Sequence, residues 1–92
     1  MKFKKNTAFM IEFISDFVNG EIKRYFFDLD YSAYVIEHFP HMEIEHAKLA
    51  DKFACTIDRA YERGTDLGLS DEAFRVEISN ALDKWLAGCT PT

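Results

Sequence analysis

The stretch FACTIDRAYERGTDLGLSDEAFRVEISNALDKWL, residues 53–86, decides the fold, because it has the pattern of a helix, an acidic bend and a second helix. Before the bend, Phe53, Ile57 and Tyr61 recur every four residues, which places them on one face of a helix. After it, Ser70 precedes Asp71 and Glu72, a typical start for a helix whose first turn favours a capping hydroxyl and negative charge. The apolar positions of this last helix are Phe74, Ile78, Ala81, Leu82, Trp85 and Leu86.

Two further amphipathic stretches lie on the N-terminal side. We expect a helix over residues 7–18, capped by Asn6 or Thr7 and ended by Asn19-Gly20, because glycine adopts the left-handed conformation that closes many helices. A second, aromatic helix is expected over residues 23–39 and should end at Phe39-Pro40, since the residue before a proline is steered away from helical angles. Its apolar positions at helical spacing are Tyr25, Phe26, Leu29, Ala33, Ile36 and Phe39.

The third helix is predicted over residues 43–63, ending at Gly64, and the fourth over residues 71–87. The third helix has an expected buried stripe of Ile44, Ala47, Ala50, Phe53, Ala54, Ile57, Ala60 and Tyr61. Four such helices with short connections predict an all-α single domain over residues 1–92, an antiparallel four-helix bundle. An arrangement with only three long helices is the alternative.

Composition limits the possible functions. The chain has 92 residues, of which 48% are hydrophobic and 29% charged, so it is long enough for one core. The formal charge is −5, and residues 41–92 hold ten acids against six bases, which argues against a phosphate backbone as partner. A basic protein suits this charge better, so we expect no nucleic-acid partner. We also expect a cytoplasmic protein without a membrane span, since acids interrupt the apolar N-terminal segment.

Catalytic and metal-binding patterns are weak. His38, His41 and His46 lie among glutamates, but His41 and His46 are five residues apart and so leave one helix face, unlike a zinc-binding pair. Cys55 falls inside an apolar helical pattern with no histidine near it in sequence, which predicts a buried and therefore inert free thiol. Cys89 is also expected to be a free thiol. We therefore predict no enzyme, no metal and no cofactor.

Acidic residues gather around the bend between the third and fourth helices, at Asp58, Glu62, Asp66, Asp71 and Glu72. Asp58 and Glu62 are four residues apart, so they share a helix face and repel one another slightly. A cationic partner would offset that repulsion. Arg59, Arg63 and Arg75 lie near enough in sequence to neutralise part of the charge, so a solvated helix face explains the same residues equally well.

The segment Phe17-Val18-Asn19-Gly20-Glu21-Ile22 resembles the signature that opens the colicin D immunity family, the bacterial self-protective colicin-like immunity proteins. The second half is similar to the last two helices of that family, from Leu49 through Asp58 and the polar bend into residues 69–78 and 82–85. Immunity proteins of contact-dependent growth inhibition systems share this general appearance. The chain departs from the family's acid-rich bend at Arg63, Gly64 and Gly68.

This resemblance implies a four-helix bundle that forms a heterodimer with the nuclease domain of a cognate bacterial toxin, a tRNA-cleaving ribonuclease. Acidic residues of the inhibitor would then occupy the toxin's basic active-site cleft in place of substrate phosphates. The resemblance assigns this role to Asp58, Glu62 and Asp66, with Asp71 and Glu72 as supporting charge. The alternative from another functional class is a small helical regulatory or adaptor protein that binds its partner through an apolar surface, such as Tyr31, Tyr34 and Tyr61.

Overall fold

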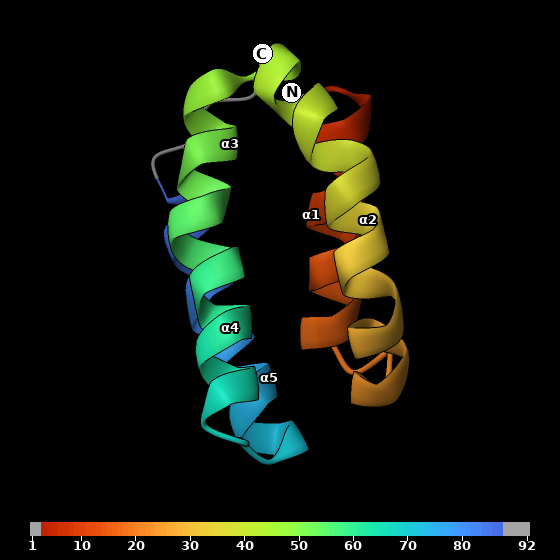
Figure 1. The fold of residues 1–92 in the computed structure, drawn as a ribbon, viewed down its shortest axis with the longest axis vertical. Coiled ribbons are helices and arrows are strands. Elements are labelled where there is room, and N and C mark those ends of the chain that lie inside the picture. Colours follow the sequence, from red (N-terminus) through yellow and green to blue (C-terminus); the bar gives the residue numbers. More distant parts are fainter. Residues whose placement is uncertain (1–2, 88–92) are drawn as a thin grey trace.

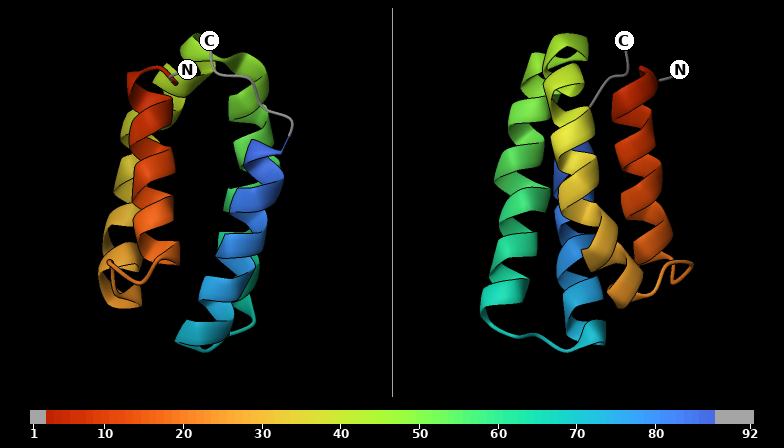
Figure 2. Two further views of the ribbon diagram at one scale, coloured as in Figure 1. Left: turned by 180° about the vertical axis from the view of Figure 1, so that it is seen from behind. Right: turned by 45° about the vertical axis from the view of Figure 1, so that its right-hand side comes forward.

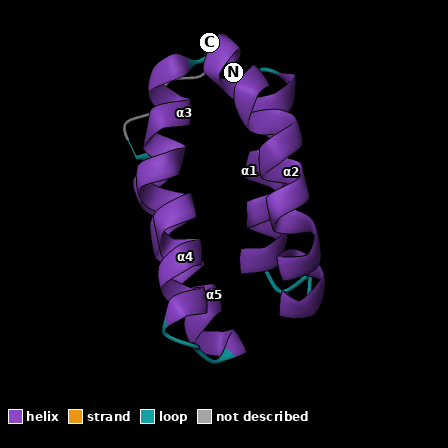
Figure 3. Cartoon of the chain, viewed as in Figure 1, coloured by secondary structure: helices purple, strands orange, loops and turns teal. Residues whose placement is uncertain are grey.

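The computed structural model describes residues 3–87, and this part of the chain is helical without strands (Figures 1 and 3). Because α3, a π-helical turn (η1) and α4 follow one another without a break, these described residues form four long helical segments. The elements are α1 (Lys5–Val18), α2 (Arg24–Glu45), α3 (Ala47–Phe53), η1 (Ala54–Asp58), α4 (Arg59–Asp66) and α5 (Asp71–Leu86). The all-helical prediction is therefore confirmed for residues 3–87.

The helices lie in two pairs. Figure 2 shows α1 beside α2, and the continuous α3–α4 segment beside α5. The two pairs meet where α1 contacts α5 and where α2 contacts α3. Within the described residues, no helix is long and apolar enough to cross a membrane.

The start of α1 differs from the sequence prediction. The helix begins at Lys5, so Asn6 and Thr7 lie in its first turn and do not cap it. Their backbone N–H groups donate instead to the Glu45 carboxylate, at 2.9 Å for Asn6 and 2.8 Å for Thr7. A side chain from the last turn of α2 thus supplies the cap, which no local pattern reveals. The predicted end is confirmed, since α1 stops at Val18 and Gly20 has φ = 84°.

The predicted break at Phe39-Pro40 is wrong, because α2 continues through Pro40 to Glu45. Proline costs a helix one backbone hydrogen bond. The turn beyond it buries Met42 and places the Glu45 cap, and both contributions favour continuing the helix. The chain breaks instead at His46, whose Nδ1 accepts a hydrogen bond from the Leu49 N–H at 3.2 Å and so caps α3.

The predicted apolar row of the second helix lies on its exposed side. Tyr25, Phe26, Leu29 and Ile36 are 70%, 52%, 63% and 77% exposed, and Ala33 is exposed as well. The buried residues of α2 are Phe27, Tyr31 and Met42, while Phe39 is partly buried. Two faces of this helix carry apolar residues at helical spacing, and periodicity alone cannot say which of them packs inward.

The third predicted helix is shifted and interrupted. Its expected first residues, Ile44 and Ala47, are exposed, and so is Ala54. The stripe that does pack inward consists of Leu49, Ala50, Phe53, Ile57 and Ala60. The π-helical turn η1 adds one residue to a turn of the helix and so resets its face halfway along.

Gly64 does not end this helix, which continues to Asp66. A Cβ atom on Gly64 would collide with the Phe74 ring, so glycine here allows α4 and α5 to approach closely. The chain turns at Gly68, with φ = 61°.

The last helix follows its prediction closely. Ser70 Oγ accepts a hydrogen bond from the Ala73 N–H at 3.2 Å and caps α5. Phe74, Ile78, Ala81 and Trp85 are buried, and Leu82 and Leu86 pack against them. The indole Nε1 of Trp85 donates to the Leu49 carbonyl at 3.0 Å, so α5 is fixed to α3 as well as packed against it.

Candidate functional site

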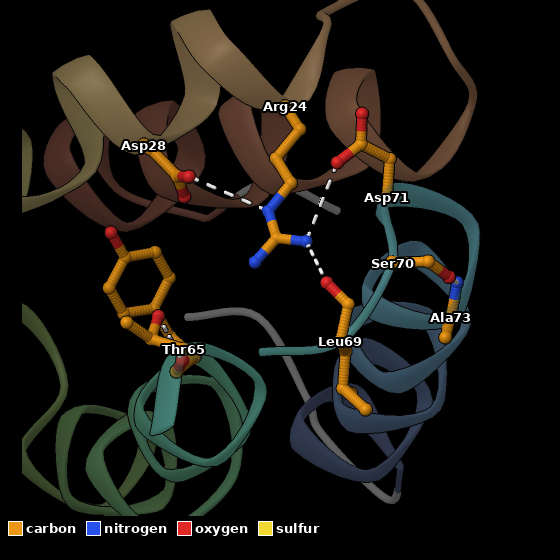
Figure 4. A network of polar contacts seen from close by, with 8 residues as sticks. Arg24, Asp28, Thr65, Leu69, Ser70, Asp71 and Ala73 are labelled. Atoms are coloured by element: carbon orange, nitrogen blue, oxygen red, sulfur yellow. Dashed lines mark hydrogen bonds and ion pairs between the residues drawn. The ribbon is translucent and has the colours of Figure 1, made fainter. Parts of the chain in front are cut away.

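Arg24, the first residue of α2, joins that helix to the bend between α4 and α5 (Figure 4). Its Nη1 donates to the Leu69 carbonyl and lies 3.5 Å from Asp71 Oδ1, while its Nε lies 3.5 Å from Asp28 Oδ2. The guanidinium carbon also lies 4.2 Å from the centre of the Phe74 ring. A single, mostly buried cation therefore lies between the carboxylates of Asp28 and Asp71.

Two tyrosines pack next to this network. The rings of Tyr31 and Tyr61 stack with their centroids 3.9 Å apart, and the Tyr31 hydroxyl donates to Asp58 Oδ1 at 2.9 Å. Burial, followed by the charge and hydrogen bond of Asp58, raises the pKa of Tyr31 far above its ordinary value. Burial, followed by the charge of Asp28, also raises the pKa of Tyr61. Both hydroxyls therefore stay neutral donors facing carboxylates at physiological pH.

The five acids expected around the bend do not form one cluster. Asp58 is half-buried beside Tyr31 and close enough to influence Tyr61. Glu62 is exposed on the next turn and contributes to the raised pKa of Tyr31. Asp66, also exposed, shares with Glu62 a shallow hollow on α4, but Arg59 and Arg63 line the same hollow.

The two acids at the start of α5 lie apart from these three. Asp71 faces Arg24, which neutralises part of its charge. Asp71 and Glu72 both line a groove between α5 and the end of α1 that also contains Arg75 and Val76. Within residues 3–87, no Lys or Arg forms an ion pair with Asp58, Glu62, Asp66 or Glu72.

Asp28, on α2, is a further acid beside those of α4, and the sequence did not single it out. It pairs with Arg24 and faces Tyr61 across the α2–α4 junction. The available signal was the spacing of Arg24 and Asp28, four residues apart, which is typical of an ion pair on a helix. We call Asp28, Asp58, Glu62 and Asp66 the acidic face.

The tyrosines suggested as an apolar contact surface are largely used by the core. Tyr31 is buried with 2% of its surface exposed, and Tyr34 and Tyr61 are partly buried against the same cluster. An apolar contact surface would therefore have to consist of other residues.

Two of the three histidines make contacts within the fold, and the described cysteine lies at the surface. His38 Nδ1 lies 2.7 Å from Asn6 Oδ1, and His46 caps α3. Within residues 3–87, no group of three or more His, Cys, Asp or Glu side chains is placed to hold a metal ion.

Cys55 is a free thiol but is exposed, contrary to the prediction of a buried one, because η1 turns it outward into a groove with Arg59 and Lys84. Cys89 lies outside the described residues.

Comparison with known proteins finds no similarity: no family model, no curated protein and no solved structure matches the chain. The resemblance to the colicin D immunity family therefore depends only on the residues quoted above.

Proposed function

We propose that the chain is an immunity protein, an antiparallel four-helix bundle that binds the nuclease domain of a cognate toxin and blocks its basic active-site cleft. The protein would have no enzymatic activity of its own. It would act in the cytoplasm as one half of a heterodimer, against a ribonuclease that cleaves tRNA.

One observation carries this proposal. Asp58, Glu62 and Asp66 are presented on one helical segment without a cationic partner among the described residues, and Asp28 adds a fourth carboxylate from α2. Within residues 3–87, Glu62 and Asp66 form no ion pair, and like charges four residues apart on a helix repel one another, so the fold gains nothing from this pair. A basic cleft would gain much from them, both in association rate and in specificity.

Arg59 and Arg63 reduce the negative charge of the hollow that contains Glu62 and Asp66. We therefore assign the strongest part of the contact to the end of the acidic face near Asp28, Asp58 and Glu62. Asp71 and Glu72 would contribute to the long-range attraction that steers association.

Inhibition of the neighbouring toxin tests this proposal. The proposal predicts that a nuclease domain is encoded next to this chain. That domain is mixed with wild-type protein or with the Glu62→Lys/Asp66→Lys variant, and tRNA cleavage is measured. We expect wild-type protein to abolish cleavage and the variant to lose at least 100-fold in affinity.

The matched control is Asp51→Lys/Asp83→Lys. It changes the net charge by the same amount at two exposed acids outside the acidic face, and it should inhibit nearly as well as wild type. Equal weakening by both variants would mean that only net charge matters. A neighbouring nuclease that wild-type protein neither binds nor inhibits would contradict the proposal.

The second candidate, an adaptor that binds a partner through an apolar surface, is favoured by the exposed row on α2. An adaptor of this kind should tolerate Glu62→Lys/Asp66→Lys.

A further inference from the structure

The outer side of α2 carries a row of apolar residues that the fold leaves uncovered. Ile36 and Ile44 are 77% and 84% exposed, Tyr25 and Leu29 are 70% and 63% exposed, and Phe26 is 52% exposed. Together with the exposed Ala33, these residues recur at helical spacing, and we call them the α2 stripe. At about 1.5 Å per residue, the row follows a helix roughly 33 Å long.

Single exposed apolar residues are common on soluble proteins, but a contiguous row of large ones is not. The α2 stripe lies opposite Phe27, Tyr31 and Met42, the residues that α2 buries, so the helix is apolar on both sides. Its outer side therefore has the composition of an interface centre, where large apolar and aromatic residues are enriched.

The borders of the α2 stripe are acidic. Each residue turns an α-helix by about 100°, which places Asp30 and Glu37 along one border of the α2 stripe. Glu43 lies at the other border, and Asp28 lies on that side but further round the helix. Lys23 and His41 are the basic side chains beside the row. Arg24 faces inward to Leu69, Asp28 and Asp71 and leaves only 15% of its side chain exposed.

We propose that the α2 stripe is the apolar centre of the contact with a protein partner whose own apolar patch is bordered by Lys and Arg. This inference rests on the proposed function, because the partner is the same basic nuclease domain. Asp28 connects the two surfaces, since it borders the α2 stripe and is also a member of the acidic face, where it interacts with Tyr61 of α4. The apolar row supplies buried area, and the carboxylates around it select a cationic rim.

A second copy of this chain fits the α2 stripe less well. Two α2 helices packed antiparallel about Ala33 would place Asp30 of one copy near Glu37 of the other. Like charges would then meet along that border, and each copy brings a formal charge of −5. Charge complementarity therefore favours a basic partner.

Affinity measurements with the nuclease domain encoded next to this chain test the inference. The variant Leu29→Gln/Ile36→Gln removes apolar surface without changing charge, and both positions are exposed, so the fold should be unaffected. We expect its affinity for the nuclease domain to fall at least 100-fold, mainly through faster dissociation, with an unchanged dependence on salt. Glu62→Lys/Asp66→Lys should instead slow association and weaken the salt dependence.

The control is Val76→Gln, an exposed apolar residue on α5 that is 55% exposed, which should bind within threefold of wild type. If Leu29→Gln/Ile36→Gln also binds within threefold, the inference is wrong while the proposed function stands. If wild-type protein does not bind the nuclease domain, both are wrong. Sedimentation equilibrium of the isolated chain tests whether a second copy covers the α2 stripe. If wild-type protein is a dimer and Leu29→Gln/Ile36→Gln is a monomer, the α2 stripe binds a second copy and the inference is wrong.

Discussion

The two faces of α2 use similar residues for different purposes. On the inner face, Phe27 is fully buried, and its ring stacks on those of Phe13 and Phe17 at centroid distances of 5.0 and 4.0 Å. On the outer face, Leu29 and Ile36 are mostly exposed. Both rows have helical spacing, yet only one is consumed by folding. The other is available for a partner.

Carboxylates show the same contrast. Glu45 accepts hydrogen bonds from the backbone and side chains of both Asn6 and Thr7, at 2.8–2.9 Å, and completes the start of α1. Glu62 and Asp66 are exposed on α4 with no ion pair among residues 3–87. Glu45 therefore stabilises the fold through its hydrogen bonds, whereas Glu62 and Asp66 have no such role among residues 3–87.

The largest difference between the faces should appear when one residue from each is truncated. Phe27→Ala should lower the free energy of unfolding by about 3–5 kcal/mol, because it leaves a cavity among stacked rings. Leu29→Ala should change it by less than about 0.5 kcal/mol, as for most surface substitutions. Urea unfolding followed by circular dichroism measures both. Equal losses would mean that α2 packs in a different rotation.

Gly64 tests the inner face of α4. Alanine usually stabilises an exposed helical position by about 1 kcal/mol relative to glycine. Here the added methyl group would meet the buried Phe74 ring, so Gly64→Ala should destabilise the fold by about 1–3 kcal/mol. The denaturant concentration at the unfolding midpoint should therefore fall for Gly64→Ala. A rise in this midpoint would show that α4 and α5 do not approach closely here.

Glu45 should make stability depend on pH. Burial alone would raise the pKa of Glu45, but the hydrogen bonds from Asn6 and Thr7 outweigh it and lower the pKa from 4.5 to about 2. Because the pKa is lower in the folded state, the contribution is present above pH 4.5 and is lost as the pH falls toward 2.

Glu45→Gln should therefore cost roughly 1–2 kcal/mol at pH 7 and much less at pH 2. Glu43→Gln, an exposed neighbour two residues earlier, serves as the control and should cost little at either pH. Denaturant unfolding at several pH values provides the comparison. A constant difference between the two variants across this range would refute the role of Glu45 as a cap.

The smallest effect on stability is expected for Glu62→Lys/Asp66→Lys. Neither acid supports the fold, so the free energy of unfolding should stay within about 0.5 kcal/mol of wild type. Thermal melts at low and high salt are the measurement. A loss of several kcal/mol would mean that these carboxylates are structural and would remove the main support for the acidic face.

Sequence reasoning succeeded where one helix has one apolar face and local caps. Ser70, Phe74, Ile78 and Trp85 were enough to define α5. It failed for α2, where two rows share the same period, and where the contacts of Met42 and Glu45 outweigh the helix-breaking tendency of Pro40.

The candidate site was only partly predictable for the same reason. Asp58 and Glu62 follow from spacing along one helix. Asp28 reaches the acidic face only because α2 packs against α4, and the sequence gives no sign of that contact.

Hydroxyl-radical footprinting of the chain alone and with the nuclease domain encoded beside it tests most directly whether the outer faces of α2 and α4 bind a basic protein. Tyr25, Phe26 and Leu29 are exposed enough to be oxidised readily in the free chain. We predict that complex formation protects them several-fold while Val76 on α5 stays reactive. Protection of Val76 with an unchanged α2 stripe would contradict this account.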